Sequence, residues 1–124
     1  MNAILSKSLR LRYLNLLGCN ISITCGDGWY DLIDILCCGI EHYQDSAGVS
    51  LVSIKEIKEC HGGLVYVSAT EDPFILGMIN HCQLMSYRVC ERCGWRAIPS
   101  ALDLGMKTYC ENCIGTRRTS EKEH

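Results

Sequence analysis

Four cysteines toward the end of this 124-residue chain have the types and spacing of a metal site. Cys90 and Cys93 form one Cys-x-x-Cys pair, Cys110 and Cys113 form a second, and sixteen residues separate the two pairs. Two residues between cysteines let both sulfurs of a tight turn face one ion, and two such turns complete a tetrahedron. The spacing predicts zinc at these four residues; the alternative is four reduced thiols or two redox-active pairs.

A shell of four thiolates leaves no coordination position for water, so such a site is structural rather than catalytic. The Zn²⁺ would contribute folding free energy to residues 89–115, which contain few large apolar side chains. We therefore expect a C-terminal zinc ribbon-like hairpin, followed by a polar tail at residues 116–124.

The chain contains ten cysteines, and a secreted protein would use so many as disulfides. Lys7, Arg10 and Arg12 interrupt the apolar core that a signal peptide requires, and no apolar run is long enough to span a bilayer. We expect a reducing, cytoplasmic compartment and no membrane partner. The six cysteines outside the predicted site are interpreted as small buried hydrophobic residues: Cys19, Cys25, Cys37, Cys38, Cys60 and Cys82.

Two Cys–His neighbours offer a second metal site or a Cys–His nucleophile pair. Cys60 and His61 lie at a predicted turn, and His81 and Cys82 lie on a predicted helix, so their proximity depends on the fold. A catalytic thiol also needs a base and a pocket that excludes water, and no other motif indicates one. We expect a protein that is not an enzyme.

The stretch from Cys25 to Tyr43 predicts an amphipathic helix, because apolar residues from Trp29 onward recur at steps of three and four. Asp27 is the predicted N-cap, and Trp29 is predicted to anchor this helix to a following hairpin. A second stripe is acidic, and we favour a solvated helix face; the alternatives are that it binds a metal, binds a basic protein surface or mimics the charge of nucleic acid. The stripe consists of Asp27, Asp31, Asp34, Glu41 and Asp45.

The remaining elements complete an α+β prediction. Residues 50–60 and 64–70 predict a β-hairpin around the "HGG" turn, and Pro73 fits the first position of a second helix. That helix is expected to bury a stripe containing Phe74, Met78, Ile79, Cys82 and Met85. The predicted divisions are an N-terminal segment at 1–25 with a short helix, a helix–hairpin–helix core at 26–88, the zinc hairpin at 89–115 and the tail.

Charge is unevenly distributed along the chain. Residues 1–12 carry three basic and no acidic residues, whereas residues 13–87 carry two lysines against nine carboxylates. Around the predicted zinc site, Arg92 and Arg96 flank Trp95, which could stack on a nucleic-acid base. The alternative, which we favour, is a structural role in which Trp95 and Tyr109 pack over the metal and the arginines are solvated.

The order of the motifs resembles that of a family of small, largely uncharacterised phage and prophage proteins. The matching features are "GDGWYDLIDIL" at Gly26 to Leu36, a hairpin with Lys58, Glu59, Gly62, Gly63 and Leu64, and the two cysteine pairs. His61 stands where the family usually has an aromatic residue, and Val65 stands where it often has a basic one. The resemblance implies a mobile-element origin and the cytoplasm of a bacterial host.

These observations lead to two classes of function. The first is a non-enzymatic zinc protein that binds a host or phage protein, with inhibition of a host defence system as one form of this role. The second is a nucleic-acid-binding regulator that uses the basic and aromatic zinc hairpin. Residues expected to contact a partner lie on the acidic stripe, the hairpin turn and the zinc segment: Asp27, Asp31, Asp34, Glu41, His61, Arg92, Trp95 and Arg96.

Overall fold

The computed structural model describes residues 1–18, 21–48, 52–97 and 108–113, and it confirms the predicted α+β class. Cys19 and the predicted tail at 116–124 lie outside the described residues. The elements are α1 (Ala3–Arg12), α2 (Leu14–Leu17), β1 (Ser22–Thr24), the 3-10 helix η1 (Asp27–Trp29), α3 (Tyr30–Ala47), β2 (Ile54–Cys60), β3 (Gly63–Ser68) and α4 (Pro73–Ser86).

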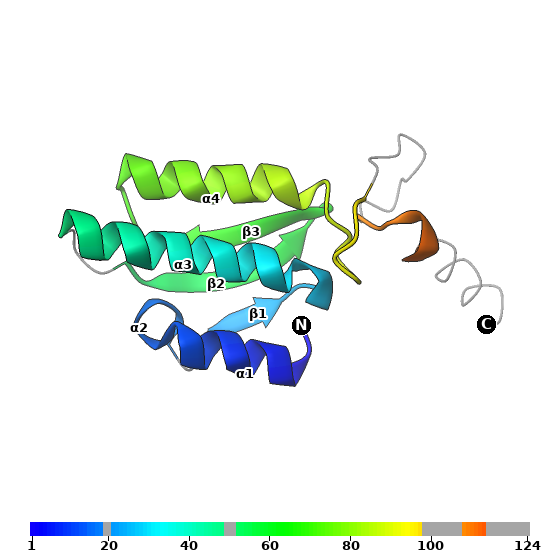
Figure 1. Ribbon diagram of the computed structural model, residues 1–124, viewed down its shortest axis with the longest axis horizontal. Coiled ribbons are helices and arrows are strands. Elements are labelled where there is room, and N and C mark those ends of the chain that lie inside the picture. The colour runs from blue at the N-terminus through cyan, green and yellow to red at the C-terminus, as the bar shows by residue number, and fades with distance from the viewer. Residues whose placement is uncertain (19–20, 49–51, 98–107, 114–124) are drawn as a thin grey trace.

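The sheet has the strand order β1-β2-β3. The predicted hairpin is confirmed as the antiparallel pair β2 and β3, in which Ile57 lies opposite Tyr66. Strand β1 was not predicted, and it runs parallel to β2 with Ile23 opposite Ile57. Parallel neighbours require a crossover connection, which α3 supplies. Figure 1 shows α3 and α4 side by side across the sheet, with α1 and α2 next to β1.

The hairpin sequence alternates imperfectly because the strand register shifts between Ile54 and Glu56. An extra residue there changes which side chains face the core, and the strict two-residue period is lost. The connecting turn has positive φ angles at His61 (52°) and Gly62 (84°). Gly62 reaches this conformation without a Cβ penalty, whereas His61 adopts the left-handed region as a non-glycine residue.

The N-terminal helix is confirmed, and it is attached to α3 by polar contacts. The side chain of Asn2 accepts a hydrogen bond from the amide of Ile4 and caps α1. Arg12 donates to Asp34 Oδ1 at 2.9 Å, and the hydroxyl of Tyr13 donates to the same oxygen at 2.5 Å. One member of the predicted acidic stripe is therefore already paired within the chain.

Helix α3 confirms the predicted apolar stripe but begins later than predicted. Trp29, Ile33 and Ile40 are fully buried, as a helix that packs one face on a core requires. Asp27 is not its N-cap, because the chain first makes the turn of η1 and α3 then begins at Tyr30. The carboxylate of Asp27 instead accepts a hydrogen bond from the amide of Asn2 at 2.6 Å.

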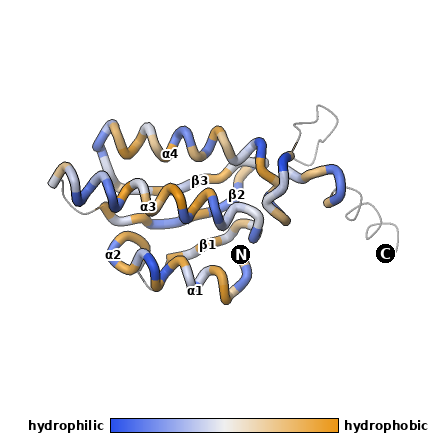
Figure 2. The backbone as a smooth tube through the Cα atoms, viewed as in Figure 1, coloured by the Kyte–Doolittle hydropathy of each residue, from blue (hydrophilic) through white to orange (hydrophobic). Residues whose placement is uncertain are grey.

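Helix α4 begins as predicted, but its buried face is different. Asp72 accepts hydrogen bonds from the first-turn amides of Phe74 and Ile75, and Pro73 takes the first helical position. The buried residues are Ile75, Cys82 and Ser86, whereas Phe74 and Met85 are exposed. The predicted stripe is confirmed for Cys82 and in part for Met78 and Ile79, which pack against the core, and it was wrong for Phe74 and Met85. Hydrophobic residues recur on several sides of this helix, so periodicity could not select one side (Figure 2).

Candidate metal centre

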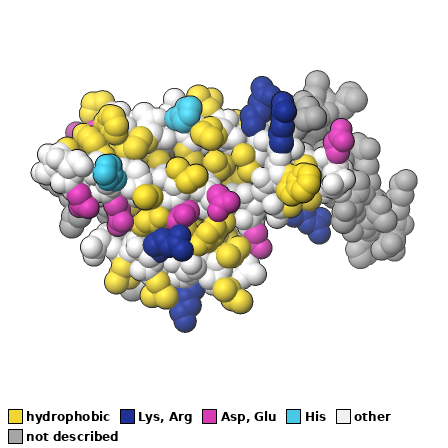
Figure 3. All heavy atoms as spheres, in the orientation of Figure 1, with side chains coloured by type: hydrophobic (Ala, Val, Ile, Leu, Met, Phe, Trp, Pro, Cys, Tyr) yellow, Lys and Arg dark blue, Asp and Glu magenta, His cyan; other side chains and the backbone are white. Residues whose placement is uncertain are grey.

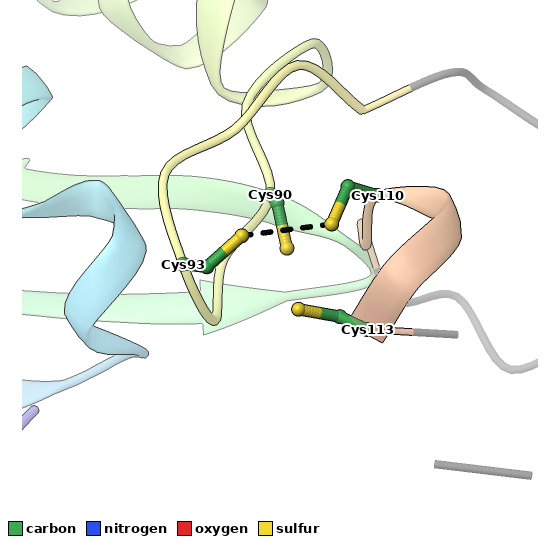
Figure 4. Close-up of side chains that lie close together, drawn as sticks. All are labelled: Cys90, Cys93, Cys110 and Cys113. Atoms are coloured by element: carbon green, nitrogen blue, oxygen red, sulfur yellow. Dashed lines mark hydrogen bonds between the residues drawn. The ribbon is translucent and has the colours of Figure 1, made fainter. Parts of the chain in front are cut away.

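The four predicted ligands converge in space. The sulfur atoms of Cys90, Cys93, Cys110 and Cys113 all lie within 4.8 Å of one another, and none of these residues forms a disulfide. Figure 4 shows their side chains pointing toward a common centre, two from the loop after α4 and two from the turn at residues 110–113. The chain thus brings together a set of four thiols that could hold a metal ion.

The spacing of the sulfurs matches a tetrahedral ion rather than a disulfide. Cys93 Sγ and Cys110 Sγ are 3.5 Å apart, whereas a disulfide requires about 2.05 Å. A zinc–sulfur bond of about 2.3 Å places the sulfurs of a regular tetrahedron about 3.8 Å apart. The Cys93–Cys110 separation lies close to that value and the other sulfurs lie within 4.8 Å, so the cluster could hold an ion of this size.

The first cysteine pair sits in a knuckle, which we define as residues 89–96. The amide of Cys90 donates to the carbonyl of Trp95 at 2.6 Å, and the amide of Gly94 donates back to the carbonyl of Cys90 at 2.9 Å. An isolated antiparallel bridge joins Val89 to Arg96. Gly94 has a φ of 84°, a conformation that favours glycine, so the chain can reverse immediately after Cys93.

The knuckle packs directly on the backbone of the Gly-Asp-Gly-Trp segment. The amide of Gly28 donates to the carbonyl of Glu91 at 2.7 Å, and the amide of Gly26 donates to the Glu91 side chain at 2.9 Å. A Cβ on Gly28 would lie 2.0 Å from the carbonyl oxygen of Cys90. A Cβ on Gly26 would lie 2.2 Å from the carbonyl oxygen of Glu91. Both glycines are therefore required by close approach of two backbones.

Trp29 extends the same attachment into the core. Its side chain is fully buried, and its indole Nε1 donates to the carbonyl of Val89 at 2.9 Å. The sequence predicted that Trp29 would anchor α3 to the hairpin, but the hydrogen bond joins it to the start of the knuckle. A buried indole N–H needs a partner, and the knuckle backbone provides it.

The hairpin turn supports the second cysteine pair. The carbonyl of Thr108 accepts a hydrogen bond from the amide of Glu91 at 2.8 Å, and its hydroxyl donates to the carbonyl of Gly62 at 2.5 Å. At the neighbouring position, a Cβ on Gly63 would lie 2.4 Å from the hydroxyl of Tyr87. Gly26, Gly28 and Gly63 thus make room for the chain from Tyr87 to Gly94, which carries Cys90 and Cys93.

The protonation of the thiols differs across the cluster. The amide of Cys113 hydrogen-bonds to Cys110 and lowers the pKa of that thiol to about 7, because the bond stabilises the thiolate. Loss of solvation raises the pKa of Cys93 and of Cys113, and hydrogen bonds from neighbouring thiols raise that of Cys113 further. Cys110 therefore loses its proton more readily than Cys93 or Cys113, and a bound cation would favour the thiolate form of those two.

The structure does not gather the predicted acidic stripe into one site. Asp31 and Asp45 are exposed, Asp27 bonds to the N-terminal backbone, and Asp34 is paired with Arg12. Loss of solvation and the charge of Asp45 raise the pKa of Glu41, as expected for adjacent carboxylates on one helix. The stripe is therefore an acidic helix surface with one internal ion pair.

The predicted basic and aromatic residues lie on the outside of the knuckle. Arg92 and Arg96 are exposed. Trp95 is 69% exposed, and among the large apolar residues that the structure describes only Ile4 is more exposed. The interpretation that Trp95 packs over the metal was wrong, because the knuckle turns this side chain into solvent. Tyr109 is half-buried.

The other cysteines divide into two groups. Cys25, Cys37 and Cys82 are buried as predicted, and burial raises the pKa of Cys37 to about 12. Cys38 and Cys60 are exposed, which corrects their predicted burial. Cys38 follows a core residue on α3 and so points outward, and Cys60 ends β2 at the turn.

The two Cys–His neighbours do not form a second cluster. Among the described residues, only the four knuckle-region cysteines bring three or more histidine, cysteine or carboxylate ligands together. The thiol of Cys82 faces the core and lies 3.7 Å from the carbonyl of Leu32, whereas His81 is exposed beside it on α4.

One surface feature was not predicted from the sequence. An apolar groove of about 560 Å³ lies between α3 and α4, and exposed side chains such as Ile35, Phe74 and Met85 line it. Figure 3 shows these apolar side chains gathered over the two helices, with acidic side chains along one side. The available signal was the hydrophobic character of α4 on more than one side, which the single-stripe interpretation discarded.

The chain matches no protein-family model, no curated protein and no solved structure. Among the residues described, no helix combines the length and apolar character needed to cross a bilayer. Fold and site together define a small α+β protein with a four-cysteine cluster packed against a Gly-x-Gly-Trp turn.

Proposed function

We propose that the four-cysteine cluster binds one zinc ion and that this ion has a structural role. Thiolates suit zinc, and a shell filled by four of them has no open position for a substrate or for water. The backbone of Gly28 in η1 bonds directly to Glu91 of the knuckle. Glu91 also bonds to Thr108, whose hydroxyl donates to Gly62 in the hairpin turn, so fixing the knuckle also constrains those segments. Metal analysis of the purified protein tests this, with about one zinc per chain expected.

The paired replacement Cys90→Ser and Cys93→Ser provides the matched comparison. It removes two ligands that lie in one turn and should abolish zinc binding. Cys38→Ser, at an exposed cysteine outside the cluster, should retain it. Full zinc content in the paired variant would show that the ligands lie elsewhere.

We propose further that the protein acts by binding another protein, without catalysis. The observation that carries this proposal is the exposed apolar groove between α3 and α4, since contiguous apolar surface on a small protein marks an interaction site. Affinity purification from a bacterial lysate, followed by mass spectrometry, tests the proposal. Recovery of nucleic acid with no specific protein would contradict it. A host defence protein as the partner stays a prediction from the family resemblance.

The exposure of Trp95 favours one alternative, the binding of nucleic acid by the knuckle. An exposed indole between two arginines offers both stacking and phosphate contacts. Titrations with single-stranded DNA and RNA at several salt concentrations test this, because phosphate contacts must weaken as salt rises. Trp95→Ala should then reduce binding, whereas absent binding would remove the alternative.

A further inference from the structure

The groove between α3 and α4 is formed by the fold itself. Leu32 and Ile35 line it from α3, and Phe74, Met78 and Met85 line it from α4. One end is fixed by an aromatic stack and a hydrogen bond that join the two helices. Because both walls are helices, the groove exists before any partner arrives, which lowers the entropic cost of binding.

Tyr43 and Phe74 hold the C-terminal end of α3 against the N-terminal end of α4. Their rings stack with centroids 4.4 Å apart, and the Tyr43 hydroxyl donates to Asp72 at 2.8 Å. Asp72 also caps α4, so one carboxylate orients both the helix and the stack. The relative position of the two walls is thereby set by specific contacts.

A glycine in the middle of α4 leaves open space in the groove. Gly77 lines the groove, and a Cβ placed on it would meet no atom within 4 Å. Glycine weakens a helix interior relative to alanine, so its presence normally reflects a close packing contact. Within the described residues no such contact exists, and the free space lies in the groove.

The charged residues within the two groove helices are all acidic, apart from the titratable His42 and His81. Helix α3 carries Asp31, Asp34, Glu41 and Asp45 and no lysine or arginine, and α4 carries no charged residue other than the titratable His81. Arg12 neutralises Asp34, whereas Asp31 and Asp45 remain exposed. A partner that covers the groove and the outer surface of α3 would therefore be favoured if it carried positive charge.

We propose that this groove binds an amphipathic helix of another protein, with its apolar face in the groove and lysines or arginines over the acidic side of α3. This inference rests on the proposed protein-binding function and specifies its partner. The exposure of Ile35 (68%) and Met85 (45%) at the two rims favours an occupant wide enough to cover both helices. Two methionines in the lining allow the surface to adapt to the partner's side chains.

The test uses two synthetic helices of about 16 residues, a length at which amphipathic peptides become helical. Both carry leucine on one face, and the opposite face is lysine in one peptide and glutamate in the other. Fluorescence anisotropy with the full zinc-containing protein should show binding of the lysine peptide, about tenfold or more tighter than the glutamate peptide at low salt. Equal affinity for the two peptides would overturn the charge argument and the proposal.

Gly77→Leu is the blocking variant. Its side chain enters the open space of the groove, so the protein should remain folded with an unchanged or raised Tm while peptide binding is lost. Ile4→Ser is the control, because Ile4 is 77% exposed on α1 and lies outside the groove. The double variant Asp31→Lys and Asp45→Lys should bind the lysine peptide more weakly and the glutamate peptide more tightly than the native protein does.

Other occupants give different results, each of which overturns the proposal. A dimer in solution that Gly77→Leu dissociates would assign the groove to a second copy of the chain. Peptide binding lost in Trp95→Ala but retained in Gly77→Leu would place it on the knuckle. A protein recovered equally by the native chain and by Gly77→Leu would leave protein binding standing and remove the groove as its site.

Discussion

The amide of Gly28 and the carbonyl oxygen of Glu91 lie 2.7 Å apart and join two segments more than sixty residues apart in the chain. Gly28 lies in η1 at the start of α3, and Glu91 lies between the first two predicted ligands. The bond forms only because neither backbone is held away by a Cβ at position 28. The metal centre is thus built partly by residues that cannot ligate a metal.

Gly28→Ala should disturb the knuckle while leaving the ligands in place. The new Cβ would lie 2.0 Å from the carbonyl oxygen of Cys90 and 2.5 Å from the amide nitrogen of Gly94, so the knuckle must shift. We expect overpacking to lower the free energy of unfolding by about 1–3 kcal/mol and to weaken zinc retention against a chelator. Thermal unfolding and a chelator competition measure the two effects.

Gly77→Ala is the matched control for that substitution. Its Cβ enters open space in a helix interior, where alanine is favoured over glycine by about 1 kcal/mol. Zinc retention should not change, and Tm should rise. Equal loss of stability in both glycine variants would show that the close approach at Gly28 is not the cause.

Removal of the metal should be visible at Trp29. Its indole donates to Val89 at the start of the knuckle, so release of the knuckle should expose the ring and shift its fluorescence to longer wavelength. Trp95→Phe removes the exposed second indole and leaves Trp29 as the reporter. The far-ultraviolet circular dichroism should change little, since the ligands lie outside the described helices α1 to α4 and strands. An unchanged Trp29 spectrum after chelation would contradict this prediction, because it would mean that the cysteine cluster does not influence the packing of Trp29.

The sequence predicted the convergence of the four cysteines because local spacing determines that motif. Cys90 and Cys93 must share a turn, and Cys110 and Cys113 must share another, whatever the rest of the fold does. The surface on which the knuckle packs could not be predicted, since Gly26 and Gly28 approach Glu91 only after the chain has folded. Glycine in a sequence does not say which backbone comes near it.

The two helices show the limits of periodicity in another way. α3 has one apolar face and was predicted correctly, whereas α4 packs Ile75 on the core and presents Phe74 and Met85 to solvent. A hydrophobic period marks every apolar face of a helix, the core face and a binding face alike. Strand β1, only three residues long, carries too short a pattern to be recognised before its partner β2 is known.

Ser86→Ala should destabilise the junction between α4 and β3. The hydroxyl of Ser86 is fully buried; it accepts from the amide of Leu64 at 2.9 Å and donates to the carbonyl of Gln83 at 2.5 Å. Alanine would leave the buried amide of Leu64 without its partner, which costs about 1–3 kcal/mol. Chemical denaturation measures the loss, with the exposed Ser53→Ala as control. A change below about 0.5 kcal/mol, ordinary for a surface site, would contradict the assigned role.

Alkylation should separate the cysteines by exposure and pKa. At pH 8 in the zinc-bound protein, we expect N-ethylmaleimide to modify Cys38 and Cys60 first, because both are exposed. Burial raises the pKa of Cys37 to about 12 and that of Cys82 to about 11, so thiolate makes up about one part in 10⁴ and 10³ of each at that pH. Buried Cys25, with its pKa also raised to about 12, should behave like Cys37.

Peptide mapping by mass spectrometry at successive times measures these rates residue by residue. In denaturant the buried thiols should react as fast as the exposed ones, because both burial and the pKa shift require the fold. Modification of Cys37 at the rate of Cys60 in the folded protein would mean that packing of α3 on the sheet does not bury this thiol against Tyr66.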